Sequence, residues 1–348
     1  MRSLYILGQD AGSNVTDWGI FEEIKEVLLA DSQMFVAQIS VKLKNTNGAF
    51  STDNVQGIFG GETAYGQVVD VFFDGANIFS GILRNVTESY GSGTVTFLIE
   101  NILTKVAETT VVLTTASANP VSAVLGQLQA FLPASRIDVS SFSTLATEYS
   151  SAGATIGCAF TESNKTTLLQ FIQDVSSLAG FSVFTENGLV TCRPGISRSP
   201  MGQTLTGNVV RPFGDKGLAF ENFANRVKVG YGAAQVYVQE DLDSIHRHTN
   251  ETKDYSFTTD NTNSLYVTDL ISAQYFATIF LARCGNIRTQ ITLDVDDEGI
   301  SDVSLGDVFG ITAPDWYLED VPFEVLEVHR IPKDFVISLV MASKPTAA

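Results

Sequence analysis

Residues 35–48 read Phe-Val-Ala-Gln-Ile-Ser-Val-Lys-Leu-Lys-Asn-Thr-Asn-Gly and contain the clearest strand pattern of the chain. Phe35, Ala37, Ile39, Val41 and Leu43 alternate with polar residues from Gln38 to Lys44, which is the period of a strand with one buried face. The following Asn and Gly residues tolerate positive φ. The stretch therefore predicts a half-buried strand that ends in a tight turn at residues 45–48.

Two hairpins are predicted after this strand. Residues 69–73 alternate up to a turn at Asp74-Gly75-Ala76-Asn77, and the chain returns through residues 78–83. A second turn at Gly91-Ser92-Gly93 precedes a strand with Val95, Phe97 and Ile99 on one face. Short strands joined by tight turns favour an antiparallel barrel or sandwich.

The composition limits the class of protein. The 348 residues carry 21 basic and 39 acidic side chains, a net charge of −18, yet only 17% are charged and 44% are hydrophobic. Disorder is excluded by this apolar content, and a protein that binds duplex DNA by neutralising phosphates is disfavoured by the few Lys and Arg. The length suggests two or three domains.

The cysteines and the apolar runs point to a soluble protein made in a cytoplasm. Cys158, Cys192 and Cys284 cannot form a disulfide framework, and we expect them to be small buried apolar residues. The first ten residues are too short an apolar stretch for a signal peptide. No run is long enough for a membrane span.

The middle of the chain predicts helices. Asn119-Pro120 begins an amphipathic segment that Pro133 ends, and Thr167 with Gln170 forms a capping box before a helix that Gly180 ends. A hairpin turning at Asn187-Gly188 follows. Residues 140–157, rich in Ser, Thr and Ala, are predicted to be an irregular connection.

The last part returns to strands and contains one helix. The helix begins at Asp269, ends at Gly285 and carries an apolar stripe. Strands are predicted at residues 226–231, 236–238, 289–295, 308–311, 323–328 and 335–341.

Two acidic or histidine-rich segments suggest metal ligands. His246-Arg247-His248 would place two imidazoles on one face of a strand near Asp241 and Asp243, but only His329 remains as a further histidine. Residues 294–299, Asp-Val-Asp-Asp-Glu-Gly, lack the spacing of an EF-hand. We expect no metal: a structural or solvent-exposed role for His246 and His248, and an acidic turn at residues 294–299.

No catalytic motif is present in the sequence. Gly230-Tyr231-Gly232 is followed by Gln235 where a dinucleotide fingerprint needs its third glycine, and no nucleophile elbow, zinc-protease motif or P-loop occurs. A glycosidase carboxylate pair is defined by separation in space, and nothing in the sequence selects one. We therefore predict no catalytic residue, no cofactor and no enzyme activity.

The order of these segments resembles that of phage tail baseplate hub proteins. The strand and turn at residues 35–50 and the hairpin at 69–83 are similar to the N-terminal barrel of that family. Residues 166–181 with the Asn187-Gly188 hairpin are similar to its middle domain. Residues 221–229 and the turn Leu305-Gly306-Asp307-Val308-Phe309 are similar to parts of its second barrel.

The resemblance implies a mainly β fold with helical insertions (α+β), in which two tail-tube-like antiparallel β-barrels carry peripheral α+β domains. The first barrel would comprise residues 1–116 and the second residues 205–240 and 286–344. Residues 117–204 would form a peripheral domain, and residues 241–285 an insertion with a helix.

The resemblance also implies a role. The chain would be a structural hub in the tail of a virion, assembled in the bacterial cytoplasm as a homotrimeric ring. The ring would join the sixfold tail tube, or a distal tail protein, to a threefold spike or fibre, and would pass DNA and the tape-measure protein. An acidic channel would repel phosphates, so DNA would slide without binding.

Two other functions stay open at this stage. One is a carbohydrate-binding tail module, although 23 Phe against 2 Trp and 10 Tyr favour core packing over sugar platforms. The other is a peptidoglycan or glycan hydrolase, which would need a carboxylate pair in a cleft. Fold alone does not exclude a grafted site.

Overall fold

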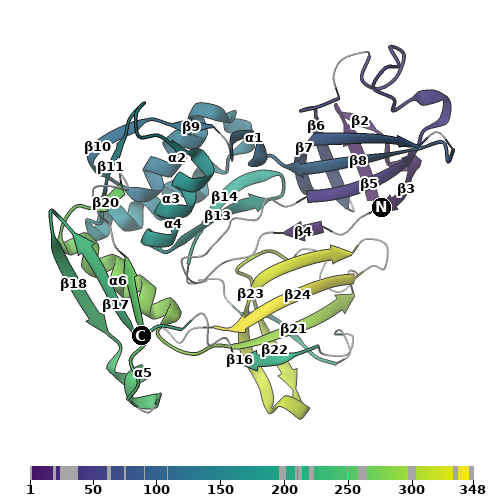
Figure 1. Cartoon of the computed structure of the whole chain (residues 1–348). Helices are drawn as coiled ribbons and strands as arrows, with labels where there is room; N and C mark the ends of the chain where they lie inside the picture. The colour runs from purple at the N-terminus through teal and green to yellow at the C-terminus, as the bar shows by residue number, and fades with distance from the viewer. Residues whose placement is uncertain are drawn as a thin grey trace.

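The computed structural model describes most of the chain, and its residues form three parts (Figure 1). The described ranges are 2–18, 21–23, 38–60, 64–73, 76–89, 91–107, 109–195, 201–207, 210, 214–218, 223–248, 250–257, 265–296, 303–331 and 336–344. Each part surrounds a hydrophobic cluster of its own. Phe35, Ala37 and the turn residues Asp74 and Gly75 lie outside the described residues.

The first part is a seven-stranded antiparallel sheet in the order β2-β1-β6-β7-β8-β5-β3. Its strands are β1 (Arg2–Ile6), β2 (Gln9–Asp10), β3 (Val15–Trp18), β5 (Gln38–Lys44), β6 (Val68–Phe73), β7 (Ala76–Ser89) and β8 (Thr94–Asn101), with 3-10 turns η1 (Gly12–Asn14) and η2 (Thr46–Gly48). Both predicted hairpins are confirmed, and the long β7 belongs to both.

The alternation that predicted this sheet is confirmed residue by residue. In β5, Ile39, Val41 and Leu43 are buried and their neighbours are exposed. The turn after β5 contains Asn47 at φ 59° and Gly48 at φ 66°, as its sequence predicted. The sequence did not predict β1, although its Leu4 and Ile6 are fully buried beside β6.

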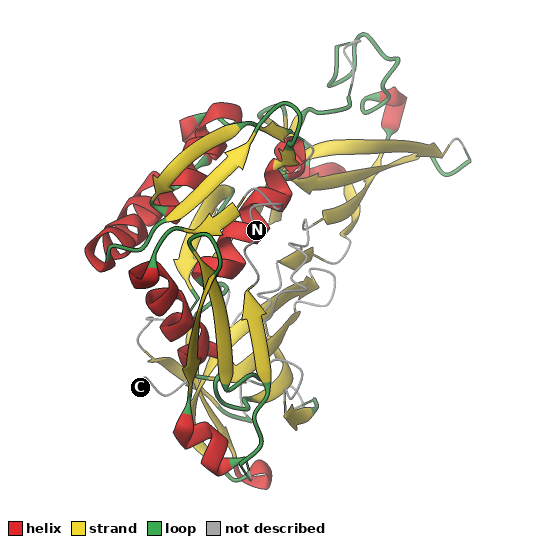
Figure 2. Cartoon of the chain, turned by 60° about the vertical axis from the view of Figure 1, so that its left-hand side comes forward, coloured by secondary structure: helices red, strands yellow, loops and turns green. Residues whose placement is uncertain are grey.

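The middle part combines helices with short sheets, and its long helices lie together (Figure 2). Its helices are α1 (Thr104–Ala107), α2 (Pro120–Phe131), η3 (Ala134–Arg136), α3 (Val139–Ala152), α4 (Leu168–Ala179), α5 (Leu242–Arg247) and α6 (Leu270–Cys284). Its strands are β9 (Thr110–Val111), β10 (Leu113–Ala118), β11 (Ile156–Phe160), β12 (Thr166–Thr167), β13 (Phe181–Glu186), β14 (Leu189–Pro194), β17 (Arg226–Tyr231), β18 (Gln235–Glu240), β19 (Asp254–Phe257) and β20 (Leu265–Val267).

The predicted helix ends are confirmed with their capping contacts. The Asn119 side chain accepts hydrogen bonds from the Val121 and Ser122 amides, and Thr167 accepts one from Gln170. The Gln170 side chain binds Asp174 at 2.7 Å, so the capping box is not reciprocal. Asp269 caps α6 by accepting from the Ser272 amide.

The prediction of an irregular connection at residues 140–157 is wrong, because α3 fills most of it. Asp138 caps this helix, which buries Phe142, Leu145 and Tyr149 on one face. The small polar residues that suggested a loop satisfy their hydroxyls inside the helix: Ser143 and Thr147 donate to carbonyls four residues earlier. Tertiary burial of three large side chains outweighs the weak helix propensity of the rest.

The third part is a second seven-stranded sheet, ordered β15-β22-β23-β24-β21-β16 with β4 pairing β23. Its elements are β4 (Phe21–Glu23), β15 (Met201–Leu205), β16 (Lys216–Leu218), β21 (Thr289–Asp296), β22 (Val308–Ala313), η5 (Pro314–Trp316), β23 (Leu318–Ile331) and β24 (Val336–Ser343). All pairs are antiparallel except β15 with β22. The mainly β fold with helical insertions is confirmed.

The structure corrects the expected place of residues 226–240. The resemblance implied that they belong to the second barrel, but β17 and β18 lie in the sheet β10-β11-β20-β17-β18 of the middle part. The reason is packing: Val227 and Val229 of β17 are fully buried in the middle cluster together with Phe276 of α6. Glu221 and Asn222, which the resemblance included, lie outside the described residues.

An N-terminal segment crosses between the two large sheets. β4 pairs with β23, so that Glu22 lies opposite His329, while β3 just before it belongs to the first sheet. No described helix is long and apolar enough to cross a membrane.

Candidate functional site

The hairpin β13–β14 lies where the three parts meet. Phe181, Val183, Val190 and Cys192 of this hairpin belong to the hydrophobic cluster of the middle part. Phe184 belongs to the cluster of the second sheet. The hairpin therefore inserts side chains into two cores, and we call it the junction hairpin.

The turn of the junction hairpin touches the first sheet. Asn187 and Gly188 adopt φ 50° and 75°, which fits the tight turn that Asn-Gly predicts. A Cβ atom on Gly188 would overlap Ser80 Oγ and lie 2.9 Å from Asn77 Nδ2. Glycine is thus required here both for its conformation and for the close approach to β7.

Polar contacts join the first sheet to the middle part beside this turn. Ser80, which is 2% exposed, donates a hydrogen bond to Asp70. Asp70 also forms an ion pair with Arg136, a residue of the middle part, at 3.2 Å. Asn101, fully buried at the end of β8, donates to Thr185 of the junction hairpin. These contacts satisfy groups that would be costly to bury alone.

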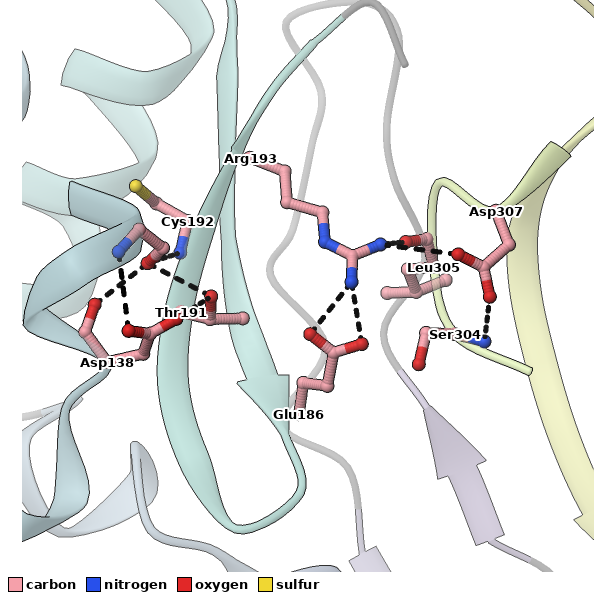
Figure 3. A network of polar contacts seen from close by, with 9 residues as sticks. Asp138, Glu186, Thr191, Cys192, Arg193, Ser304, Leu305 and Asp307 are labelled. Carbon is pink, nitrogen blue, oxygen red and sulfur yellow. Dashed lines mark hydrogen bonds and ion pairs between the residues drawn. The ribbon is translucent and has the colours of Figure 1, made fainter. Parts of the chain in front are cut away.

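Arg193 joins the other side of the junction hairpin to the second sheet (Figure 3). Its Nη2 donates to both carboxylate oxygens of Glu186, at 2.7 and 2.8 Å. Its Nη1 donates to the Leu305 carbonyl and lies 3.8 Å from Asp307 Oδ1. The guanidinium also lies over the Phe184 ring, 5.4 Å from the centroid.

The loop that receives Arg193 is the Leu-Gly-Asp-Val turn of the sequence. Gly306 adopts φ 78°, and its amide donates to the Val325 carbonyl. Asp307 Oδ2 accepts from the Ser304 amide at 2.8 Å. These contacts fix the loop to β23 without Arg193, and the loop presents one carbonyl and one carboxylate to the guanidinium.

A second polar group ties α3 to the junction hairpin. Ser141 Oγ donates to the Asp138 carbonyl and accepts from the Cys192 amide at 3.1 Å. Burial alone would raise the pKa of Asp138, but hydrogen bonds from Ser140 and Ser141 outweigh it and hold this pKa below its usual value. Asp138 thus stays ionised and keeps the end of α3 fixed beside β14.

The histidines singled out in the sequence do not form a pair on a strand. They lie at the end of α5, because Asp241 caps a short helix there by accepting from the Ser244 amide. His246 Nδ1 contacts Asn250 at 3.0 Å, whereas the His248 ring packs against Phe223. Within the described ranges, no three His, Cys, Asp or Glu side chains gather as metal ligands.

The other candidate residues lie in strands and turns of the fold. Asp294 and Asp296 lie on β21, and residues 297–299 lie outside the described residues. Gly230 lies in β17 and Gly232 in the turn to β18, so a strand, not a helix, begins after this turn. The three cysteines are buried and form no disulfide with one another, as expected.

Sequence reasoning missed Arg193, Glu186 and Asp70 as contact residues. No local pattern marks them: Arg193 and Asp70 contact residues far along the chain, and Glu186 contributes by holding Arg193. The Asn187-Gly188 turn and the Leu305–Phe309 segment were recognised, but nothing in the sequence indicated that one hairpin joins them.

Comparison with known proteins reveals the fold. No family model and no curated protein matches the sequence. Among solved structures, a tail protein from Neisseria meningitidis MC58 matches 98% of this chain and 95% of its own, with a TM-score of 0.59 at 12% identity. The 43 kDa tail protein of prophage MuSo2 from Shewanella oneidensis matches 99% and 96%, with a TM-score of 0.56 at 10% identity.

A third structure extends the likeness to a secretion machine. The E. coli c3393 protein, a component of the type VI secretion system with structural similarity to the T4 tail proteins gp27 and gp5, matches 99% of this chain and 77% of its own. The TM-score is 0.51 at 10% identity. The chain therefore has the fold of phage tail proteins, and the expected resemblance is confirmed at the level of fold.

Proposed function

We propose that this protein is a non-enzymatic structural hub of a phage tail or a related injection machine. Three copies form a ring that joins the sixfold tail tube, or a distal tail protein, to a threefold spike or fibre. The observation that carries the proposal is the likeness over nearly the whole chain, 98% of it and 95% of the Neisseria tail protein.

The proposal assigns a task to each part. The first sheet (β1–β3 and β5–β8) and the second sheet (β4, β15, β16 and β21–β24) act as two quasi-equivalent units per chain, so three chains offer six to the tube. The helices and short sheets of the middle part, including β17 and β18, form the peripheral part. The junction hairpin holds both sheets in one orientation through Phe184, Gly188 and Arg193.

The charge supports passage of DNA through the ring. Residues 1–118 carry 6 basic and 13 acidic side chains, and residues 201–348 carry 11 and 21, so the acid lies in the segments that contain both sheets. An acidic lumen repels phosphates and gives no affinity from released counterions. DNA and a tape-measure protein therefore pass without being held.

The symmetry of the particle tests the proposal. Native mass measurement of the purified full chain should give a multiple of three copies, and cryo-EM of tails should place it on the tail axis with threefold symmetry. A compact monomer found only away from the axis would contradict the proposal. The purified ring should also fail to bind duplex DNA at low salt, and salt-sensitive binding would contradict the account of the lumen.

A further inference from the structure

Strand β18 forms an outer edge of the middle sheet (Figure 1). It exposes apolar side chains there. Val236 and Val238 are 61% and 47% exposed. Gly230 lies opposite Val236 across the β17–β18 pair, so no side chain of β17 lies directly opposite that valine. Among the described strands, only β17 pairs with β18.

This edge lacks the features that usually prevent strands from pairing with other chains. Edge strands are commonly protected by lysine, proline, a bulge or short length. β18 has six residues, Gln-Val-Tyr-Val-Gln-Glu, without lysine or proline, and its register with β17 is uninterrupted from Arg226 to Tyr231. Its outward backbone groups form a ready template for another strand.

The sequence of β18 indicates which strand would pair with it. Gln235-Val236-Tyr237-Val238-Gln239 reads the same in both directions around Tyr237. In an antiparallel pair of two such strands centred on Tyr237, Val236 of one copy lies opposite Val238 of the other. Gln235 then lies opposite Gln239, and the two Tyr237 side chains meet across the axis.

Charge is compatible with the same pairing. Glu240 is the one charged side chain of β18, and in this register it lies opposite Ala234, outside the strand. No like charges are therefore brought together in the pair. On β17, Arg226 and Lys228 both contact Asp254, and Arg226 also pairs with Glu240 at 3.4 Å, so two carboxylates lie beside the two cations near this edge.

We propose that two copies of this chain pair through β18, strand to strand around a twofold axis, and join their middle sheets into one. The contact does not depend on the threefold ring of the proposed function. If the ring forms, twofold pairing through β18 links two rings; if it does not, the same contact produces dimers. The area is small, so the association is weak and depends on protein concentration.

The number of chains per particle tests this pairing. The measurement is sedimentation equilibrium of the full chain over a wide range of concentration. The Val238→Lys variant places a lysine on the edge and should weaken pairing about tenfold or more. Wild-type particles should therefore contain twice as many chains as particles of the variant. Val55→Lys is the matched control, because Val55 is 72% exposed on a different part and should change nothing. Equal particle sizes for wild type and Val238→Lys would overturn the proposal.

Cysteine pairs test the register. Under mild oxidation, a mixture of the single variants Val236→Cys and Val238→Cys should form mixed disulfide dimers, while each variant alone should form few. The native cysteines are buried and should not interfere. Efficient cross-linking of one variant alone would exclude this register, and no cross-linking in the mixture would contradict the pairing of β18 with β18. If the chains pair through β18 but form no threefold ring, only the proposed function is contradicted.

Discussion

The guanidinium of Arg193 donates a hydrogen bond to the backbone carbonyl of Leu305, 112 residues further along the chain. The donor lies on a hairpin of the middle part and the acceptor on a loop of the second sheet. Glu186, on the neighbouring strand, holds the other nitrogen at 2.7 Å. One side chain thereby connects two separately packed cores, and its loss should be measurable.

Replacement of Arg193 by Met keeps the apolar stem but removes every donor. Glu186 then loses its ion pair and the Leu305 carbonyl loses a partner, so the free energy of unfolding should fall by about 1–3 kcal/mol. Urea denaturation followed by fluorescence measures this. Arg193→Lys keeps the charge but cannot contact both Glu186 and the Leu305 carbonyl as a planar guanidinium does. Its free energy of unfolding should therefore lie between those of the wild type and Arg193→Met. An unchanged midpoint for Arg193→Met would show that the junction does not depend on this contact.

Replacement of Gly188 by Ala should destabilise the protein for two reasons. The φ of 75° disfavours any Cβ by about 1 kcal/mol, and overlap with Ser80 Oγ adds about 1–3 kcal/mol. Gly93→Ala is the matched control, because Gly93 has φ 62° but nothing lies within 4 Å of the added Cβ. The difference between the urea midpoints of the two variants measures the cost of the contact between the added Cβ and Ser80. Equal losses of stability would show that the turn does not pack against β7.

The buried pair of Arg288 and Glu324 allows a double-mutant cycle. Their charged groups lie 2.8 Å apart, with side chains 5% and 2% exposed. Arg288→Met should cost about 3–5 kcal/mol, because it leaves a buried carboxylate without its partner. The double variant with Glu324→Leu should recover a large share of that loss. Equal stability of the single and double variants would show that Glu324 finds another partner.

The three cysteines should be unreactive in the folded protein. Burial raises the pKa of Cys158 and Cys284 to about 11 and that of Cys192 to about 12. Because the thiolate is the reactive form, a thiol reagent at pH 8 should label none of them until urea unfolds the chain, when it should label all three. Rapid labelling without urea would contradict this burial.

The same shifts give a pH dependence of stability. The thiols of the unfolded chain ionise near the ordinary cysteine pKa of 9.0, whereas the folded thiols keep their protons to higher pH. The unfolded state therefore binds fewer protons between about pH 9 and 11, and the free energy of unfolding should fall as pH rises through that range. A triple Cys→Ala variant should show a smaller fall over the same range.

Local signals in the sequence determined most elements and several of their ends. Alternation indicated β5 and β8 because one face of each strand is buried, and the caps at Asn119, Thr167 and Asp269 indicated three helix starts because orphan amides need an acceptor. α3 could not be recognised, because its hydroxyl-rich sequence becomes helical only when Phe142, Leu145 and Tyr149 are buried.

The sequence by itself determined that this chain is a strand-rich protein with helical insertions, since turn residues and periodicity act over a few neighbours. Only the tertiary structure decided which sheet receives β17 and β18 and which hairpin joins the three parts. Those choices depend on contacts between residues far apart, such as Arg193 with Leu305 and Gly188 with Ser80. No local pattern encodes such contacts, because their free energy exists only once separate cores have packed together.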